Sequence, residues 1–154
     1  MSSSATSPSD TDRRSPLRLA AAGVGAVFLL VGILGFVPGV TSGYDQLTFA
    51  GHESGALLLG VFAVSILHNL VHLAFGVAGL ALSRRADTAR NYLLYGGIVY
   101  AVLWIYGLVI DHDSDANVVP VNSADNWLHL GLAVLMVALA LVLGRRASRS
   151  EGIG

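Results

Sequence analysis

The chain has 154 residues, of which 54% are hydrophobic and only 12% are charged, about half the charged share of a typical soluble domain. A soluble globule of this composition would expose large apolar patches, so the composition favours a protein that resides in a lipid bilayer. A formal net charge of −1 gives nucleic-acid binding no electrostatic support, and the absence of cysteine excludes disulfides, thiolate metal sites and cysteine nucleophiles.

Four apolar runs follow a first segment rich in Ser, Thr, Asp and Pro, which predicts a disordered tail over residues 1–16. Runs of 18–19 residues cover about 27–29 Å as helices, close to the thickness of a bilayer core. The second run is longer, and we expect it to tilt or project outward. These runs predict one transmembrane domain over residues 17–146 and a second tail over residues 147–154. The predicted helices span approximately residues 18–37, 55–83, 90–110 and 126–144.

All nine basic residues are arginines, and they lie beside one set of helix ends. They are Arg13, Arg14, Arg18, Arg84, Arg85, Arg90, Arg145, Arg146 and Arg149. The two other connecting segments carry only acidic charges, at Asp45, Glu53, Asp111, Asp113, Asp115 and Asp125. Cytoplasmic loops of membrane proteins are enriched in arginine and lysine, so both termini and the short middle loop are predicted to be cytoplasmic. The predicted fold is an all-α, up-down four-helix bundle in the plasma membrane, with both ends inside.

Two short segments repeat, His-Asn-Leu-Val-His-Leu at residues 68–73 and Asp-Asn-Trp-Leu-His-Leu at residues 125–130. Asn69 aligns with Asn126 and His72 with His129, and each segment runs into an apolar stretch that ends in paired arginines. This pattern predicts two hairpins in tandem, related by an axis along the membrane normal. Counted back from the paired arginines, the two histidines are expected to differ in depth by about one turn, ~5–6 Å.

Polar residues cluster on one face of the second predicted helix and on one face of the fourth. Helical spacing groups Ser65, His68, Asn69 and His72 on the second, and Asp125 and His129 on the fourth. Because polar groups are costly in lipid, both faces should point into the bundle and form a polar cavity that opens outward. We predict that Ser65, Asn69 and Asn126 form the structural part of this polar seam.

Three interpretations of the histidines stay open. In the first, the imidazoles and amides only hydrogen-bond across helices and fix their packing. In the second, His68 and His72 bind one metal ion from successive turns, His129 is the third ligand, and Asp125 or Glu53 completes or orients the shell. Haem would instead take its axial ligands from His72 and His129. In the third, the histidines relay protons or line a path for a small solute.

The segments on the outer side carry weaker signals. His52 and Glu53 are candidates for an acid/base pair, but no nucleophile is nearby, and the start of a helix at Glu53 or Ser54 accounts for them. The sequence contains no P-loop, HExxH, nucleophile elbow or dinucleotide fingerprint. An enzyme acting at the outer leaflet is therefore disfavoured.

Three stretches resemble a known family: YDQLTFAGHESGALLLG, VSILHNLVHLAFGVAGLAL and VPVNSADNWLHLGLAVLM. They are similar to the bacterial four-helix membrane proteins grouped as the domain of unknown function 4383 family, over roughly residues 35–144. The resemblance implies a bacterial plasma-membrane protein with four spans, and it brings no activity. The family motifs fall on Tyr44, His52, Glu53, His68, Asn69, His72, Asp125, Asn126, Trp127 and His129.

Together these patterns predict a small, non-enzymatic, multi-pass membrane protein whose surroundings are the lipid bilayer and whose partner is a second copy or another membrane protein. The alternative is a metal- or haem-binding protein of redox chemistry or transport that uses His68, His72 and His129.

Overall fold

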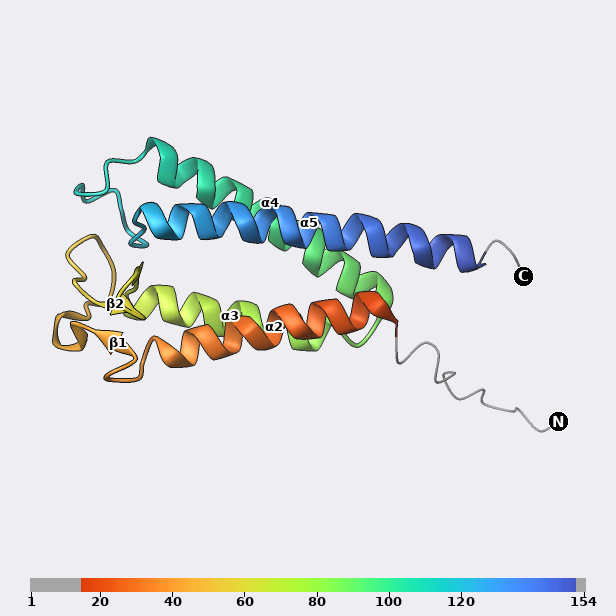
Figure 1. The fold of residues 1–154 in the computed structure, drawn as a ribbon, viewed down its shortest axis with the longest axis horizontal. Helices are drawn as coiled ribbons and strands as arrows, with labels where there is room; N and C mark the ends of the chain where they lie inside the picture. The colour runs from red at the N-terminus through yellow and green to blue at the C-terminus, as the bar shows by residue number, and fades with distance from the viewer. Residues whose placement is uncertain (1–14, 152–154) are drawn as a thin grey trace.

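The computed structural model of the protein describes residues 15–151 and contains four long helices and a small sheet. The helices are α2 (Pro16–Leu34), α3 (Ile66–Leu82), α4 (Ala86–Val109) and α5 (Ser123–Glu151). Between α2 and α3 lie the strands β1 (Thr41–Ser42), β2 (Leu57–Leu58) and β3 (Phe62–Ala63) and the short helix η1 (Tyr44–Gln46). The strands pair antiparallel in the order β1-β2-β3. The helices run back and forth along the long axis, and the sheet sits at one end (Figure 1).

The helix ends differ in part from the predicted ones. A proline opens α2 in its first turn, where its missing N–H is not needed, so the helix begins at Pro16 and the predicted tail cannot extend that far. The rest of that tail, residues 1–14, lies outside the described residues. Helix α5 does not end at residue 144 as predicted but continues to Glu151, into the predicted second tail. Residues 152–154 lie outside the described residues.

The prediction of a helix over residues 55–83 is wrong in its first third, where the chain forms β2 and β3. Helix α3 begins only after Ser65, whose side chain accepts a hydrogen bond from the backbone N–H of His68 at 3.1 Å and so caps the helix. The turn between β2 and β3 contains Leu59 and Gly60, both with positive φ (55° and 72°). The run expected to hold the longest helix therefore holds the shortest, of 17 residues.

Close backbone contact defines two helical hairpins, α2 with α3 and α4 with α5. A Cβ added at Gly25 would lie 2.9 Å from both the carbonyl oxygen of Gly76 and the nitrogen of Leu80. On the second hairpin, a Cβ at Gly97 would lie 3.1 Å from the carbonyl oxygen of Ala133. Only glycine permits such a close approach of two backbones.

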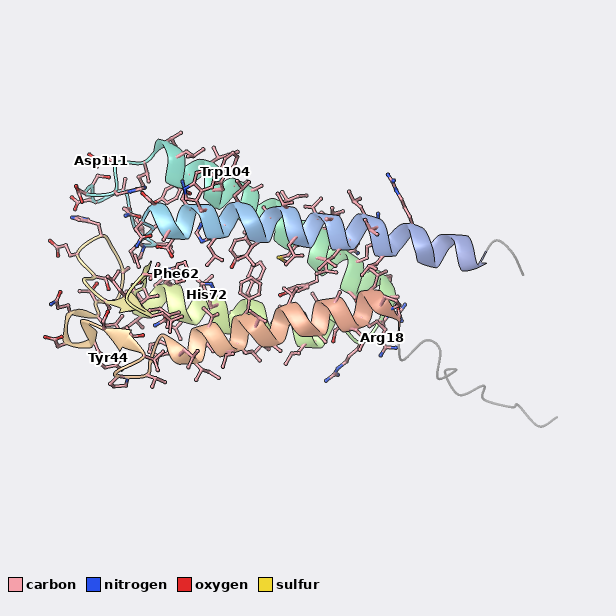
Figure 2. The ribbon with its side chains drawn as sticks, in the orientation of Figure 1. Arg18, Tyr44, Phe62, His72, Trp104 and Asp111 are labelled. Atoms are coloured by element: carbon pink, nitrogen blue, oxygen red, sulfur yellow. The ribbon has the colours of Figure 1, made fainter. Side chains whose placement is uncertain are left out.

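The outward surface of the helices is largely apolar. Large exposed side chains include Val27, Leu30, Ile33, Val102, Ile105, Leu108, Val134 and Val142. Three helices, α2, α4 and the Ser123–Arg145 part of α5, are long and apolar enough to cross a membrane, and α3 is apolar but shorter. Arg18 lies at one end of the bundle, whereas Tyr44 and Asp111 lie at the other (Figure 2).

Replacing Gly25 by Ala should destabilise the first hairpin, because the new methyl group meets backbone atoms that cannot rotate away. We expect a loss of about 1–3 kcal/mol, measured as a lower midpoint of thermal unfolding in mild detergent. Gly23 lies on the same helix with nothing within 4 Å of its added Cβ, so Gly23→Ala is the matched control and should be neutral or slightly stabilising. Equal behaviour of the two variants would contradict this packing.

Candidate functional site

A cavity of about 90 Å³ lies between the two hairpins, near the end of the bundle that carries the sheet. His68 and His72 reach it from α3, and Asp125 and His129 from α5. Apolar side chains complete its lining, at Val31, Leu58, Leu59, Phe62, Val64, Leu128 and Leu132. We call it the histidine cavity. The structure thus brings together the four residues that the sequence selected as candidate ligands.

The three histidines are almost fully buried, with 4%, 8% and 4% of His68, His72 and His129 exposed. The Nδ1 atom of His72 lies 3.1 Å from the carbonyl oxygen of His68, one turn earlier in α3. Nδ1 therefore carries the proton in this contact, and Nε2 keeps its lone pair. The two rings stack, with centroids 4.5 Å apart and an interplanar angle of 11°.

Two of the buried ring nitrogens have no hydrogen-bond partner among the described residues, namely Nδ1 of His68 and Nδ1 of His129. Both residues line the histidine cavity. Its volume corresponds to about three water molecules at ~30 Å³ each. Unpaired buried nitrogens beside such a space are the groups that ordered water or a small polar ligand would satisfy.

Aromatic rings continue the cluster towards the centre of the bundle. Phe28 of α2 contacts the ring of His72 at a centroid distance of 5.5 Å, and Tyr100 of α4 contacts His129 at 5.4 Å. Phe28 and Tyr100 then stack on each other, at 5.3 Å and 15°. Neither residue could be recognised from the sequence, because an isolated aromatic residue in an apolar run carries no distinguishing signal.

Asp125 is held by backbone groups from both hairpins. One carboxylate oxygen accepts hydrogen bonds from the N–H of Asn122 at 3.0 Å and from the N–H of Ala63, on β3, at 2.9 Å. Asn122 in turn caps α5, because its side-chain oxygen accepts from the N–H groups of Ala124 and Asp125. The spacing Asn-x-x-Asp is a reciprocal cap of the start of a helix, and this signal in the sequence identifies Asn122.

The contacts within one hairpin recur in the other. Asn69 and Asn126 are the fourth residues of α3 and α5, and His72 and His129 are the seventh. The side chain of Asn69 packs against Gly35, and that of Asn126 packs against Gly107. The histidines therefore occupy equivalent places counted from the helix starts, and the predicted difference of one turn in depth is wrong.

The same correspondence extends to α2 and α4. Gly25 and Gly97 lie 72 positions apart, as do Gly35 and Gly107 and the stacked rings of Phe28 and Tyr100. Gly25 contacts Gly76 and Leu80, and Gly97 contacts Ala133 and Val137. These last two residues lie 57 positions after Gly76 and Leu80, respectively. Equivalent residues thus make equivalent contacts, and Phe28 and Tyr100 meet where the two hairpins face each other.

His68 and Asp125 occupy equivalent positions, each the third residue of its helix. Asp125 reaches across to the other hairpin, where it accepts from the N–H of Ala63. The residue equivalent to Ala63 is Pro120, which has no N–H, so a carboxylate at position 68 could not form the matching bond.

The residues predicted to form the rest of the polar seam lie elsewhere. Ser65 caps α3, and Asn69 and Asn126 pack inside their own hairpins rather than between α3 and α5. Asn69 Nδ2 and Asn126 Oδ1 are buried without a hydrogen-bond partner among the residues that the structure describes. The seam is therefore narrower than predicted and consists of the three histidines and Asp125.

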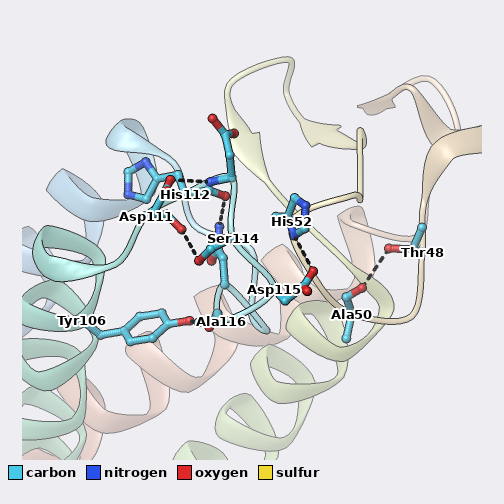
Figure 3. A network of polar contacts seen from close by, with 11 residues as sticks. Thr48, Ala50, His52, Tyr106, Asp111, His112, Ser114, Asp115 and Ala116 are labelled. Carbon is cyan, nitrogen blue, oxygen red and sulfur yellow. Dashed lines mark hydrogen bonds and ion pairs between the residues drawn. The ribbon is translucent and has the colours of Figure 1, made fainter.

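His52 and Glu53 lie in the loops at the end of the bundle and do not line the histidine cavity. His52 Nδ1 is 4.0 Å from a carboxylate oxygen of Asp115 in the loop between α4 and α5 (Figure 3). The same close-up shows Tyr106 donating to the carbonyl of Ala116. The contact between His52 and Asp115 joins the two loops, whereas the bond from Tyr106 ties α4 to the loop that follows it. An ion pair as exposed as that of His52 contributes little to stability.

No group of three or more His, Asp or Glu side chains in the described part of the chain is placed to hold one metal ion. His68, His72, His129 and Asp125 surround one cavity, but with the rings of His68 and His72 stacked they do not form a ligand set. The metal site stays a prediction, and it requires at least one imidazole to rotate.

Asp125→Ala should destabilise the protein, because it removes the half of the reciprocal cap that Asp125 supplies to Asn122 and leaves the buried N–H of Ala63 without a partner. We expect a loss of about 2–4 kcal/mol in the free energy of unfolding, measured in mild detergent. Asp113→Ala, in the exposed loop, should have little effect and serves as the control. Similar stability of the two variants would mean that Asp125 is not a structural link between the hairpins.

Comparison with known proteins gives one match. No curated protein and no solved structure matches the chain. A family model described as Domain of unknown function (DUF4383) matches residues 18–142, which include all four residues of the polar seam. The chain therefore belongs to the DUF4383 family, as the resemblance of its motifs predicted.

Proposed function

We propose that this protein crosses the plasma membrane four times, with both termini in the cytoplasm, and that it is a non-enzymatic membrane protein. The observation that carries the proposal is the distribution of charge on an apolar bundle. Arg18, Arg84, Arg85, Arg90 and Arg145 all belong to the end where α2 begins, α3 meets α4 and α5 runs out. The loops of the opposite end carry acidic side chains and no arginine. Positively charged ends stay on the cytoplasmic side.

The lengths of the helices agree with this arrangement. At ~1.5 Å per residue, the 19 residues of α2 span about 28 Å and the 24 residues of α4 about 36 Å. Helix α3 spans only about 25 Å, somewhat less than a bilayer core of ~30 Å. The apolar β2–β3 hairpin continues α3 at its outer end. The crossing at α3 therefore does not depend on the helix alone.

A structural role for the polar seam supports the non-enzymatic assignment. Asp125 is engaged by two backbone N–H groups, and His72 donates to the carbonyl of His68. The bond between Asp125 and Ala63 joins the two hairpins, and the other two bonds hold Asp125 and His72 in place on their own helices. Of the outer-loop pair, His52 faces Asp115 and Glu53 is exposed, so neither approaches the buried cluster.

The topology can be tested with two matched substitutions, because the chain has no cysteine of its own. Asp113 and Asp87 are both exposed and lie at opposite ends of the bundle. In intact cells, a membrane-impermeant maleimide should label Asp113→Cys at once, and Asp87→Cys only after the membrane is permeabilised. The reverse pattern would overturn the orientation, and labelling of both in intact cells would overturn the four crossings.

Binding of a transition metal is the second candidate function, and one contact favours it. Histidines that ligate metals usually donate their other ring N–H to a carbonyl or carboxylate, as Nδ1 of His72 does to His68. Its Nε2 is then free to bind, and His68 and His129 each have an unpaired Nδ1. Haem does not fit, since pockets for ligands of drug size occupy ~300–1,000 Å³ and the histidine cavity holds about 90 Å³.

Elemental analysis of protein purified in mild detergent decides between the two candidates. If the seam is structural, we expect no near-stoichiometric zinc, copper or iron, and a lower unfolding midpoint for the His72→Ala/His129→Ala double variant. If the seam binds metal, the metal should be near-stoichiometric, lost in a still-folded double variant, and retained in the control His52→Ala. Retention of metal in the double variant would exclude the seam as its site.

A further inference from the structure

We infer that the β2–β3 hairpin, residues 56–64, is an anchor in the outer leaflet, and that its tip at Leu59–Val61 contacts the acyl chains of lipid. This inference rests on the proposed crossing of the membrane, and it assigns a lipid-binding surface to a segment outside the helices. Leu59 and Val61 are 63% and 49% exposed, and no residue from 55 to 65 is charged. The hairpin therefore exposes apolar side chains, whereas the loop between α4 and α5 exposes aspartates.

The conformation of Leu59 gives the first argument. Its φ of 55° lies in the left-handed region, which is unfavourable for a residue with a Cβ. Asparagine or glycine occupies this region at less cost and is the usual choice at an exposed turn in water. A bulky apolar side chain in a strained and exposed position gains nothing from water, but it gains from burial in lipid.

The backbone of the hairpin gives the second argument, because a peptide group in contact with lipid needs a partner within the protein. Each N–H of the tip has one: Leu59 donates to Val40 at 2.9 Å, Gly60 to Leu57 at 3.2 Å and Val61 to Leu58 at 3.1 Å. Two side chains at the start of α5, those of Asn122 just before the helix and of Asp125 in its first turn, contact the free edge of the hairpin. Asn122 donates to the carbonyl of Val61 at 2.8 Å, and Asp125 accepts from Ala63.

The neighbours of the tip give the third argument. Leu59 and Leu128 both line the histidine cavity, and Leu128 is 41% exposed. Trp127, in the second turn of α5, is 71% exposed, and tryptophan is enriched where a membrane meets water. The hairpin tip and the start of α5 therefore present apolar surface at the depth where α3 falls short of the bilayer core.

Single cysteines in proteoliposomes test the anchor. We expect Leu59→Cys and Val61→Cys to react with a water-soluble maleimide roughly tenfold more slowly than Asp113→Cys, because a thiol in an apolar environment forms little thiolate. The spin relaxation of a nitroxide attached to the same cysteines should be accelerated by oxygen, which concentrates in lipid. A water-soluble nickel chelate should not accelerate it. Asp113→Cys should show the opposite preference.

Val27→Cys, on the exposed face of α2, separates the failure of the anchor from the failure of the membrane assignment. If Val27→Cys is protected and Leu59→Cys reacts as fast as Asp113→Cys, the helices lie in lipid and the hairpin lies in water, so the anchor is wrong. If Val27→Cys also reacts fast, the proposed crossing itself is wrong. Slow reaction at residues 27, 59 and 61 with fast reaction at 113 supports both.

Discussion

The contact of backbone on backbone within each hairpin is the constraint on which the rest of the structure depends. At Gly25 and Gly97 the helices approach so closely that an added methyl group would meet main-chain atoms. At Gly35 and Gly107 the missing side chain leaves the space that an asparagine fills. These four glycines set the rotation of α3 and α5 about their axes. In that rotation His72 contacts Phe28, His129 contacts Tyr100, and the two aromatic rings stack on each other. The polar seam is thus a consequence of how each hairpin closes.

Holding the hairpins together in an apolar surrounding requires that no buried backbone group is left unpaired. Asp125 meets this requirement for the N–H of Ala63, which lies on the other hairpin. Asp125 also caps α5 through Asn122, so the same carboxylate fixes the start of a helix and the edge of a strand. The cavity that remains between these contacts is small, and its shape follows from them.

Much of the fold could be predicted from the sequence, because hydropathy and helical spacing act over whole helices. The four helices and the grouping of His68, His72, Asp125 and His129 follow from such patterns. The β2–β3 hairpin could not be recognised, since an unbroken apolar run fits a buried strand or a helix equally well, and only Ser65 marks the boundary. The depth of the histidines was misjudged because Arg84 and Arg85 follow the end of α3, whereas Arg145 lies inside α5. Helix starts, marked by Ser65 and Asn122, are the better reference.

The stacking of Phe28 on Tyr100 has a consequence for how such a molecule can change over time. These residues are counterparts, and a dimer of two identical hairpins would place the same residue on both sides of its axis. Because both hairpins belong to one chain, equivalent positions need not carry the same residue. Position 68 carries an imidazole and the equivalent position 125 a carboxylate. The cavity therefore combines three histidines with a single carboxylate, a lining that two identical hairpins related by an exact axis could not provide.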